Sequence, residues 1–160
     1  MKKFSHPFHW IPYLSLTFLG TGLAPKAPGT FGTLGAMALY LLLYTLNAAT
    51  IPVFLFIVFI STLLCILFGN WMVTYFEEDD PPSVVLDEVA GYFTSLVILV
   101  PHSPLITAAL AFLFFRFFDI LKPPPVSWLE KLPKGYGVAL DDVAAGILAS
   151  LLLNLIFYIF

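Results

Sequence analysis

The chain has 160 residues, of which 60% are hydrophobic and 11% are charged, and its mean hydropathy is +0.96. A water-soluble domain rarely has so apolar a composition, so we expect an integral membrane protein with one domain over residues 1–160. The net charge of −3, without a basic run, excludes nucleic acid as a partner. The single cysteine, Cys65, lies in an apolar run and is expected to be a buried small hydrophobe.

The first 32 residues are interrupted by proline and glycine. His6, Pro7, His9 and Pro12 break the apolar stretch that a signal peptide requires, so we expect this region to be part of the mature protein. Its segment GTGLAPKAPGTFG, residues 20–32, predicts a loop that leads into a helix starting near Thr30.

Five apolar segments follow, separated by proline, glycine or charge: residues 33–48, 51–68, 89–100, 105–118 and 143–160. Each reaches or approaches the roughly 20 residues that cross a bilayer as helix, which predicts an all-α, polytopic membrane bundle of about five helices. The second segment is expected to continue through residues 71–76 at the membrane interface. The third and fourth are short and need tilting, local thinning or extension into their charged flanks.

The positive charges form two groups along the chain. One precedes the first apolar segment and the other lies at or after the end of the fourth: Lys2, Lys3 and Lys26, then Arg116, Lys122, Lys131 and Lys134. In a five-span arrangement all of them lie on one side, which the positive-inside rule assigns to the cytoplasm. A four-span arrangement, with residues 33–48 re-entrant, would divide them between both sides.

Carboxylates gather at the predicted cytoplasmic ends of the helices, where a charge is costly unless it is paired, solvated or bound to metal. They are Asp87, Glu88, Asp119, Asp141 and Asp142. Asp87, Glu88, Asp141 and Asp142 fall where a helix is expected to begin. The dipole of a helix favours an acid in its first turn, so for each residue alone this structural explanation is as good as a functional one. Asp119 falls in the last turn of its helix, where the dipole disfavours an anion. Its structural alternative is an ion pair with Arg116 or Lys122, each three residues away.

These residue types suit phosphate chemistry. Carboxylates without a nearby cysteine or histidine favour magnesium or manganese over zinc. Lys26, the Thr30 hydroxyl and the N–H groups of a helix start can bind an anion, although the same stretch also suits a rigid turn capped by Thr30. Cations for phosphate beside carboxylates for a metal, at a membrane surface, favour phosphoryl transfer.

Four motifs occur in order along the chain: GTGLAPKAPGTFGTL, DPPSVVLDEVAG, FRFFDILKPPP and GYGVALDDVAAG. In these motifs the chain resembles the bacterial phosphatidylglycerophosphatase A family. The resemblance implies magnesium-dependent hydrolysis of phosphatidylglycerophosphate to phosphatidylglycerol and inorganic phosphate, at the cytoplasmic face of the inner membrane, without an obligate protein partner. Pro124 and Tyr136 depart from the residues that the family usually has there, tryptophan and glycine, and both lie beside charged residues of the motifs.

Combined with the charge pattern, the resemblance assigns roles to the polar motif residues. The metal ligands are expected among Asp87, Glu88, Asp119, Asp141 and Asp142, all of which except Asp141 are also catalytic candidates. The substrate phosphate is expected to contact Lys26, Thr30, Arg116 and Lys122. Two alternatives remain at this point. A CDP-alcohol phosphotransferase also clusters aspartates at a membrane face, but its DGxxAR signature is missing here. A small metal-ion transporter would place its carboxylates near the membrane midplane.

Overall fold

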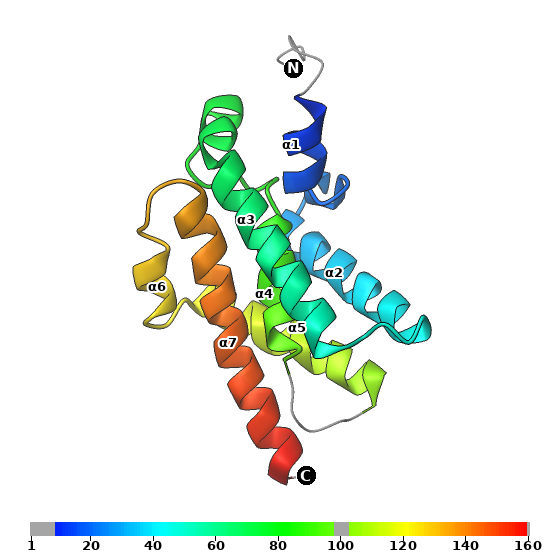
Figure 1. Ribbon diagram of the computed structural model, residues 1–160. Coiled ribbons are helices and arrows are strands. Elements are labelled where there is room, and N and C mark those ends of the chain that lie inside the picture. Colours follow the sequence, from blue (N-terminus) through cyan, green and yellow to red (C-terminus); the bar gives the residue numbers. More distant parts are fainter. Residues whose placement is uncertain (1–8, 98–102, 160) are drawn as a thin grey trace.

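The computed structural model describes residues 9–97 and 103–159. Within these ranges the chain forms seven α-helices, one short 3-10 helix and no strand, so the predicted all-α class is confirmed. In chain order they are α1 (Trp10–Leu16), η1 (Thr21–Leu23), α2 (Pro28–Thr45), α3 (Ile51–Phe76), α4 (Leu86–Ser95), α5 (Pro104–Leu121), α6 (Val126–Leu129) and α7 (Gly135–Ile159). Figure 1 shows α3 and α7 as the two long helices and α4 in the middle of the molecule.

In the described part of the chain, three helices are long and apolar enough to cross a membrane, namely α3, α5 and α7. Large apolar side chains stand exposed along them, such as Phe56 and Phe59 on α3, Leu113 on α5 and Leu151 on α7. Exposed apolar surface of this kind suits contact with lipid, so the helices support membrane association. α2 and α4 are not among these three helices, and the predicted count of about five spans therefore stays a prediction.

α4 is too short for the full membrane span that its segment, residues 89–100, was expected to approach. It has 10 residues, nine of them buried, and at 1.5 Å per residue it is about 15 Å long, half the thickness of a hydrocarbon core. It lies at the centre of the bundle, in contact with α2, α3, α5 and α7 (Figure 1). Residues 98–100 of the predicted segment lie outside the described residues, as do His6, Lys2 and Lys3.

Glycines bring α7 close to two other helices. A Cβ atom on Gly146 would lie 2.3 Å from the carbonyl oxygen of Gly91 on α4, and one on Gly135 would lie 2.0 Å from that of Cys65 on α3. No larger residue fits at these crossings, and small residues are what allow membrane helices to approach closely. Cys65 is fully buried there, as expected.

The helix boundaries refine the predicted ones. α3 continues through Phe76, as expected, and Trp71 stacks on Tyr75 in its last turns with ring centroids 4.5 Å apart. α2 begins at Pro28 rather than near Thr30, because proline suits the first position of a helix. Three short helices were not predicted from the sequence: α1, η1 and α6.

Candidate active site

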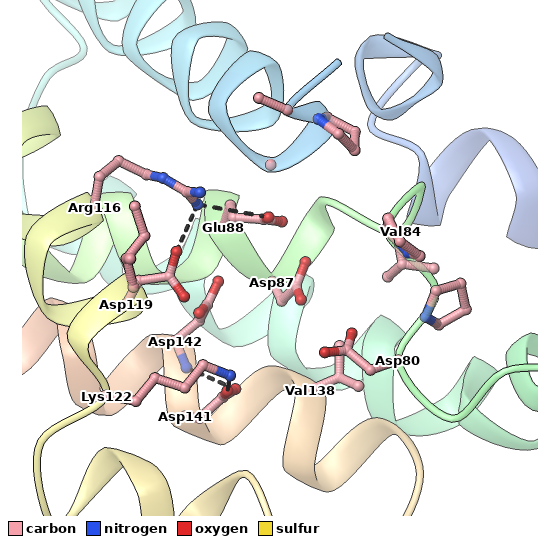
Figure 2. A pocket seen from close by; sticks show the side chains of 16 residues that line it. Asp80, Val84, Asp87, Glu88, Arg116, Asp119, Lys122, Val138, Asp141 and Asp142 are labelled. Atoms are coloured by element: carbon pink, nitrogen blue, oxygen red, sulfur yellow. Dashed lines mark hydrogen bonds and ion pairs between the residues drawn. The ribbon is translucent and has the colours of Figure 1, made fainter. Parts of the chain in front are cut away.

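A pocket of about 360 Å³ lies where α2, α4, α5 and α7 meet. Its wall combines the start of α2, the loop before α4, the first turn of α4, the end of α5 and the second turn of α7. Six carboxylates and two cationic side chains line it: Asp80, Asp87, Glu88, Asp119, Asp141 and Asp142, with Arg116 and Lys122. Figure 2 shows these side chains converging from separate helices.

The structure brings together all five predicted carboxylates, but not all of the predicted phosphate-binding residues. Lys26 and Thr30 are absent from the lining, which contains Ala27, Pro28 and Gly29 instead. The backbone at the start of α2, rather than these two side chains, therefore borders the pocket. Asp80 was not predicted as a site residue; its only signal was its place as the first residue of the DPPSVVLDEVAG motif.

Three of the carboxylates form a close group. One oxygen each from Asp87, Glu88 and Asp142 all lie within 4.8 Å of one another. Asp87 Oδ1, Glu88 Oε2 and Asp142 Oδ2 are buried and have no hydrogen-bond partner in the described part of the chain. Buried carboxylate oxygens without a partner are costly. The donor set fits a hard divalent cation, because such ions prefer carboxylate oxygens.

The glycine contact between α4 and α7 fixes the spacing of this group. Gly91 lies four residues after Asp87 and Gly146 lies four residues after Asp142, so the glycine crossing is one helical turn beyond the carboxylates. The backbones are in contact at the crossing. One turn away, side chains no longer than aspartate and glutamate are therefore close enough to meet.

Arg116 lies against two carboxylates. Its Nη1 atom is 2.5 Å from Asp119 Oδ2 and 3.7 Å from Glu88 Oε1. The prediction that Asp119 pairs with Arg116 or Lys122 is therefore resolved in favour of Arg116. The short contact is an ion pair that is not aligned as a hydrogen bond, and both Nε and Nη1 are buried without a hydrogen-bond partner in the described chain. Nη1 is engaged by the two carboxylates, whereas Nε remains able to donate to an anion.

The start of α2 packs directly on this ion pair. A Cβ atom on Gly29 would lie 2.2 Å from Glu88 Oε1 and 3.2 Å from Arg116 Nη1. A side chain at this position would push the Glu88 carboxylate aside, so glycine leaves room for the ion pair where it stands. The first turn of α2 therefore closes the pocket on the side of Arg116 and Glu88.

Lys122 connects the end of α5 to α6 and α7. Its Nζ donates hydrogen bonds to Glu130 Oε1 at 2.6 Å and Asp141 Oδ2 at 2.9 Å (Figure 2 draws the contact with Asp141). Burial alone would lower the pKa of Lys122, but the two hydrogen bonds outweigh burial and hold the pKa above its ordinary value. Lys122 is therefore cationic at neutral pH.

Asp141 and Asp142 lie deeper in their helix than expected. α7 begins at Gly135 and has no acid in its first turn, so the expectation that these two residues open the last helix is wrong. The dipole explanation fails for both, since it applies to the first turn of a helix. For Asp87 and Glu88, which lie in the first turn of α4, it remains available.

The two hydrogen bonds of Lys122 should differ in strength. A double-mutant cycle of Lys122→Met with Asp141→Asn should give a coupling of roughly 1.5–3 kcal/mol, because the Asp141 side chain is only 7% exposed. The cycle with Glu130→Gln should give about 1 kcal/mol or less, because the Glu130 side chain is 46% exposed. Denaturant unfolding in detergent measures both, and equal couplings would contradict the contrast in burial.

Comparison with known proteins identifies the family. The family model for phosphatidylglycerophosphatase A matches residues 14–157. A phosphatidylglycerophosphatase A of Haemophilus influenzae is 38% identical over 99% of this chain and 94% of its own. A protein of the same name from Escherichia coli is 31% identical over 92% of this chain and 82% of its own.

A Bacteroides thetaiotaomicron protein with the provisional name phosphatidylinositol-3-phosphatase is 34% identical over 90% of this chain and 92% of its own. No solved structure matches. The family model and the two relatives named for it cover nearly the whole length of the chain. The chain therefore belongs to the phosphatidylglycerophosphatase A family.

Proposed function

We propose that this chain hydrolyses the terminal phosphate monoester of phosphatidylglycerophosphate and releases phosphatidylglycerol and inorganic phosphate. The observation that carries the proposal is the pocket in which unpartnered carboxylate oxygens of Asp87, Glu88 and Asp142 lie close to the guanidinium group of Arg116. Family membership supports the substrate, since two relatives are named for this activity. It disfavours both a phosphotransferase of the CDP-alcohol type and a metal-ion transporter.

The charge of the pocket supports a bound metal ion. Six carboxylates against two cationic side chains would repel a phosphate anion. We therefore propose that Asp87, Glu88 and Asp142 hold magnesium, which commonly binds proteins through a few carboxylates and takes further oxygens from water and phosphate. When bound, the ion would supply positive charge that offsets the phosphate anion and polarises its phosphorus–oxygen bonds.

Arg116 and Lys122 are the proposed phosphate-binding side chains. The planar guanidinium group of Arg116 can donate two parallel hydrogen bonds to phosphate oxygens. Lys122 adds a compact positive charge on the other side of the carboxylate group. In phosphoryl transfer such positioning and charge neutralisation account for most of the catalysis.

Asp119 and Asp141 have a different proposed role from the one the sequence suggested. Asp119 is paired with Arg116 and Asp141 with Lys122, so we propose that they orient these cations rather than bind metal. Hydrolysis also needs a base for the attacking water and a proton for the departing glycerol oxygen. A carboxylate oxygen of Asp87, Glu88 or Asp142 that is not engaged by the metal would accept a proton from the water, and this proton would then pass to the departing glycerol oxygen.

The function is tested by phosphate release from purified protein in detergent micelles. Phosphatidylglycerophosphate should be hydrolysed, and Arg116→Lys should lower kcat/KM by roughly 10- to 100-fold because lysine lacks the paired donors. Thermal unfolding controls for folding of the variant. Phosphatidylinositol 3-phosphate is the comparison substrate, given the Bacteroides relative. Faster release from it, or none from phosphatidylglycerophosphate, would contradict the proposal.

The metal site can be tested without measuring activity. Magnesium should raise the unfolding temperature of the wild type, because an ion that binds only the folded state stabilises it. Asp142→Asn should lose this response. In chelator it should unfold no earlier than the wild type, because the substitution removes one of three crowded negative charges.

The matched control is Asp79→Asn, an exposed acid outside the pocket lining, which should keep the full magnesium response. An Asp142→Asn protein that magnesium stabilises as strongly as the wild type would remove Asp142 from the metal site.

We also propose that the chain crosses a bacterial cytoplasmic membrane five times, with the pocket facing the cytoplasm. Two observations support this. The starts of α2 and α4 and the end of α5 border the pocket together with the first turns of α7, as alternating passes require. The described cations also lie before α2, at the end of α5 or between α5 and α7: Lys26, Arg116, Lys122, Lys131 and Lys134. In this arrangement α4 belongs to a short pass inside the bundle.

Reporter fusions test this orientation. A reporter placed after Lys134 should read cytoplasmic and one after Phe160 periplasmic, because one pass, α7, separates the two positions. Cytoplasmic readings at both positions would contradict the five-pass arrangement.

A further inference from the structure

A second hollow, of about 420 Å³, adjoins the candidate active site. We call it the side hollow. It shares three wall residues with the active-site pocket, Pro28, Pro81 and Pro82. The rest of its wall comes from η1, the loop before α2, the end of α3 and the loop before α4. The two cavities are therefore neighbours, and these three prolines lie between them.

The segments around the side hollow pack tightly on one another, and its lining is mostly apolar. Gly22 of η1 packs on the loop before α4, where a Cβ atom would lie 2.2 Å from the carbonyl oxygen of Ser83. Leu23, Ala24 and Phe76 contribute apolar surface, and Leu23 is 51% exposed. Among the described residues of the lining, Glu78 alone is charged. A hollow of this composition suits an apolar or weakly polar ligand better than an anion.

Lys26 lies on the boundary between the two cavities. Its neighbour Pro25 lines the side hollow, its other neighbour Ala27 lines the active-site pocket, and Pro28 lines both. Lys26 is exposed, and it forms no ion pair within the described part of the chain. In contrast to Arg116 and Lys122, its charge is therefore not compensated by the carboxylates of the pocket.

The substrate of the proposed function has its own order of groups. The terminal phosphate monoester is followed by a glycerol, then an internal phosphodiester, then the diacylglycerol. With the monoester in the active-site pocket, the phosphodiester lies one glycerol away and the ester-linked chains lie beyond it. The protein has a matching order: the charged pocket, a free lysine on the boundary, and an apolar hollow with an exposed leucine at its wall.

We propose that Lys26 binds the internal phosphodiester of the lipid substrate and that the side hollow holds the glyceride ester region next to it. The inference rests on the proposed function, and it gives Lys26 a different target from the scissile phosphate expected from the sequence. The long flexible side chain of lysine suits a single charged contact of this kind. Glu78 repels an anion from the hollow itself, which favours the boundary as the place of the phosphodiester.

The two reaction products allow the two sites to be tested separately. Phosphatidylglycerol has the phosphodiester and the acyl chains but no monoester, whereas inorganic phosphate corresponds to the monoester alone. Lys26→Gln should raise the inhibition constant of phosphatidylglycerol in mixed micelles by about tenfold, the loss expected for one charge-assisted contact. The inhibition constant of inorganic phosphate should not change. For phosphatidylglycerophosphate, KM should rise while kcat stays within about twofold.

Two further variants complete the design. Lys26→Arg should restore phosphatidylglycerol inhibition, because the charge is kept. Lys131→Gln is the matched control, an exposed lysine that lies outside the linings of both the active-site pocket and the side hollow and should leave all constants unchanged.

The outcomes are distinct. A rise in the inhibition constant of inorganic phosphate with Lys26→Gln would return Lys26 to the scissile phosphate and overturn the inference. Unchanged constants for both products, or a wild type that phosphatidylglycerol does not inhibit, would also overturn it. A wild type that releases no phosphate from phosphatidylglycerophosphate would instead refute the proposed function on which the inference rests.

Discussion

The contact between the backbones of α4 and α7 determines the geometry on which the rest of the site depends. Gly91 and Gly146 leave no room for a side chain between the helices. One turn further, Asp87, Glu88 and Asp142 are consequently forced together in a buried place, with an oxygen of each within 4.8 Å of the others. Three anions so close repel one another unless a cation or a proton lies between them. Packing between apolar helices thus concentrates buried negative charge, which a divalent cation can neutralise.

The other charges of the pocket are arranged around this group rather than inside it. Asp119 holds Arg116 and Asp141 holds Lys122, so each cation is kept at the pocket by a carboxylate of its own. Such pairs reduce the cost of keeping a charge among apolar helices. Figure 2 shows Arg116 and Lys122 held in this way on either side of Asp142. An anionic substrate would then meet two cations whose positions are already fixed, which lowers the cost of ordering them on binding.

The sequence predicted the helical class and the gathering of carboxylates, because charged residues at the ends of apolar segments have few other places to lie. It could not decide between Arg116 and Lys122 as the partner of Asp119. Both are three residues away, but Lys122 follows the last helical residue and adopts a left-handed backbone with φ of 44°, which takes it off the helical face and toward Asp141. It could not show that Lys26 lies outside the lining of the pocket, since a loop path through prolines depends on long-range packing and not on local spacing.

One binding measurement addresses the proposed metal and phosphate site as a unit. Inorganic phosphate can be titrated calorimetrically into the detergent-solubilised wild type, once after removal of divalent ions and once with magnesium. If Asp87, Glu88 and Asp142 hold an ion that offsets the phosphate charge, magnesium should tighten phosphate binding by at least about tenfold, and phosphate should tighten magnesium binding by the same factor. Equal phosphate affinity with and without magnesium would contradict a shared site.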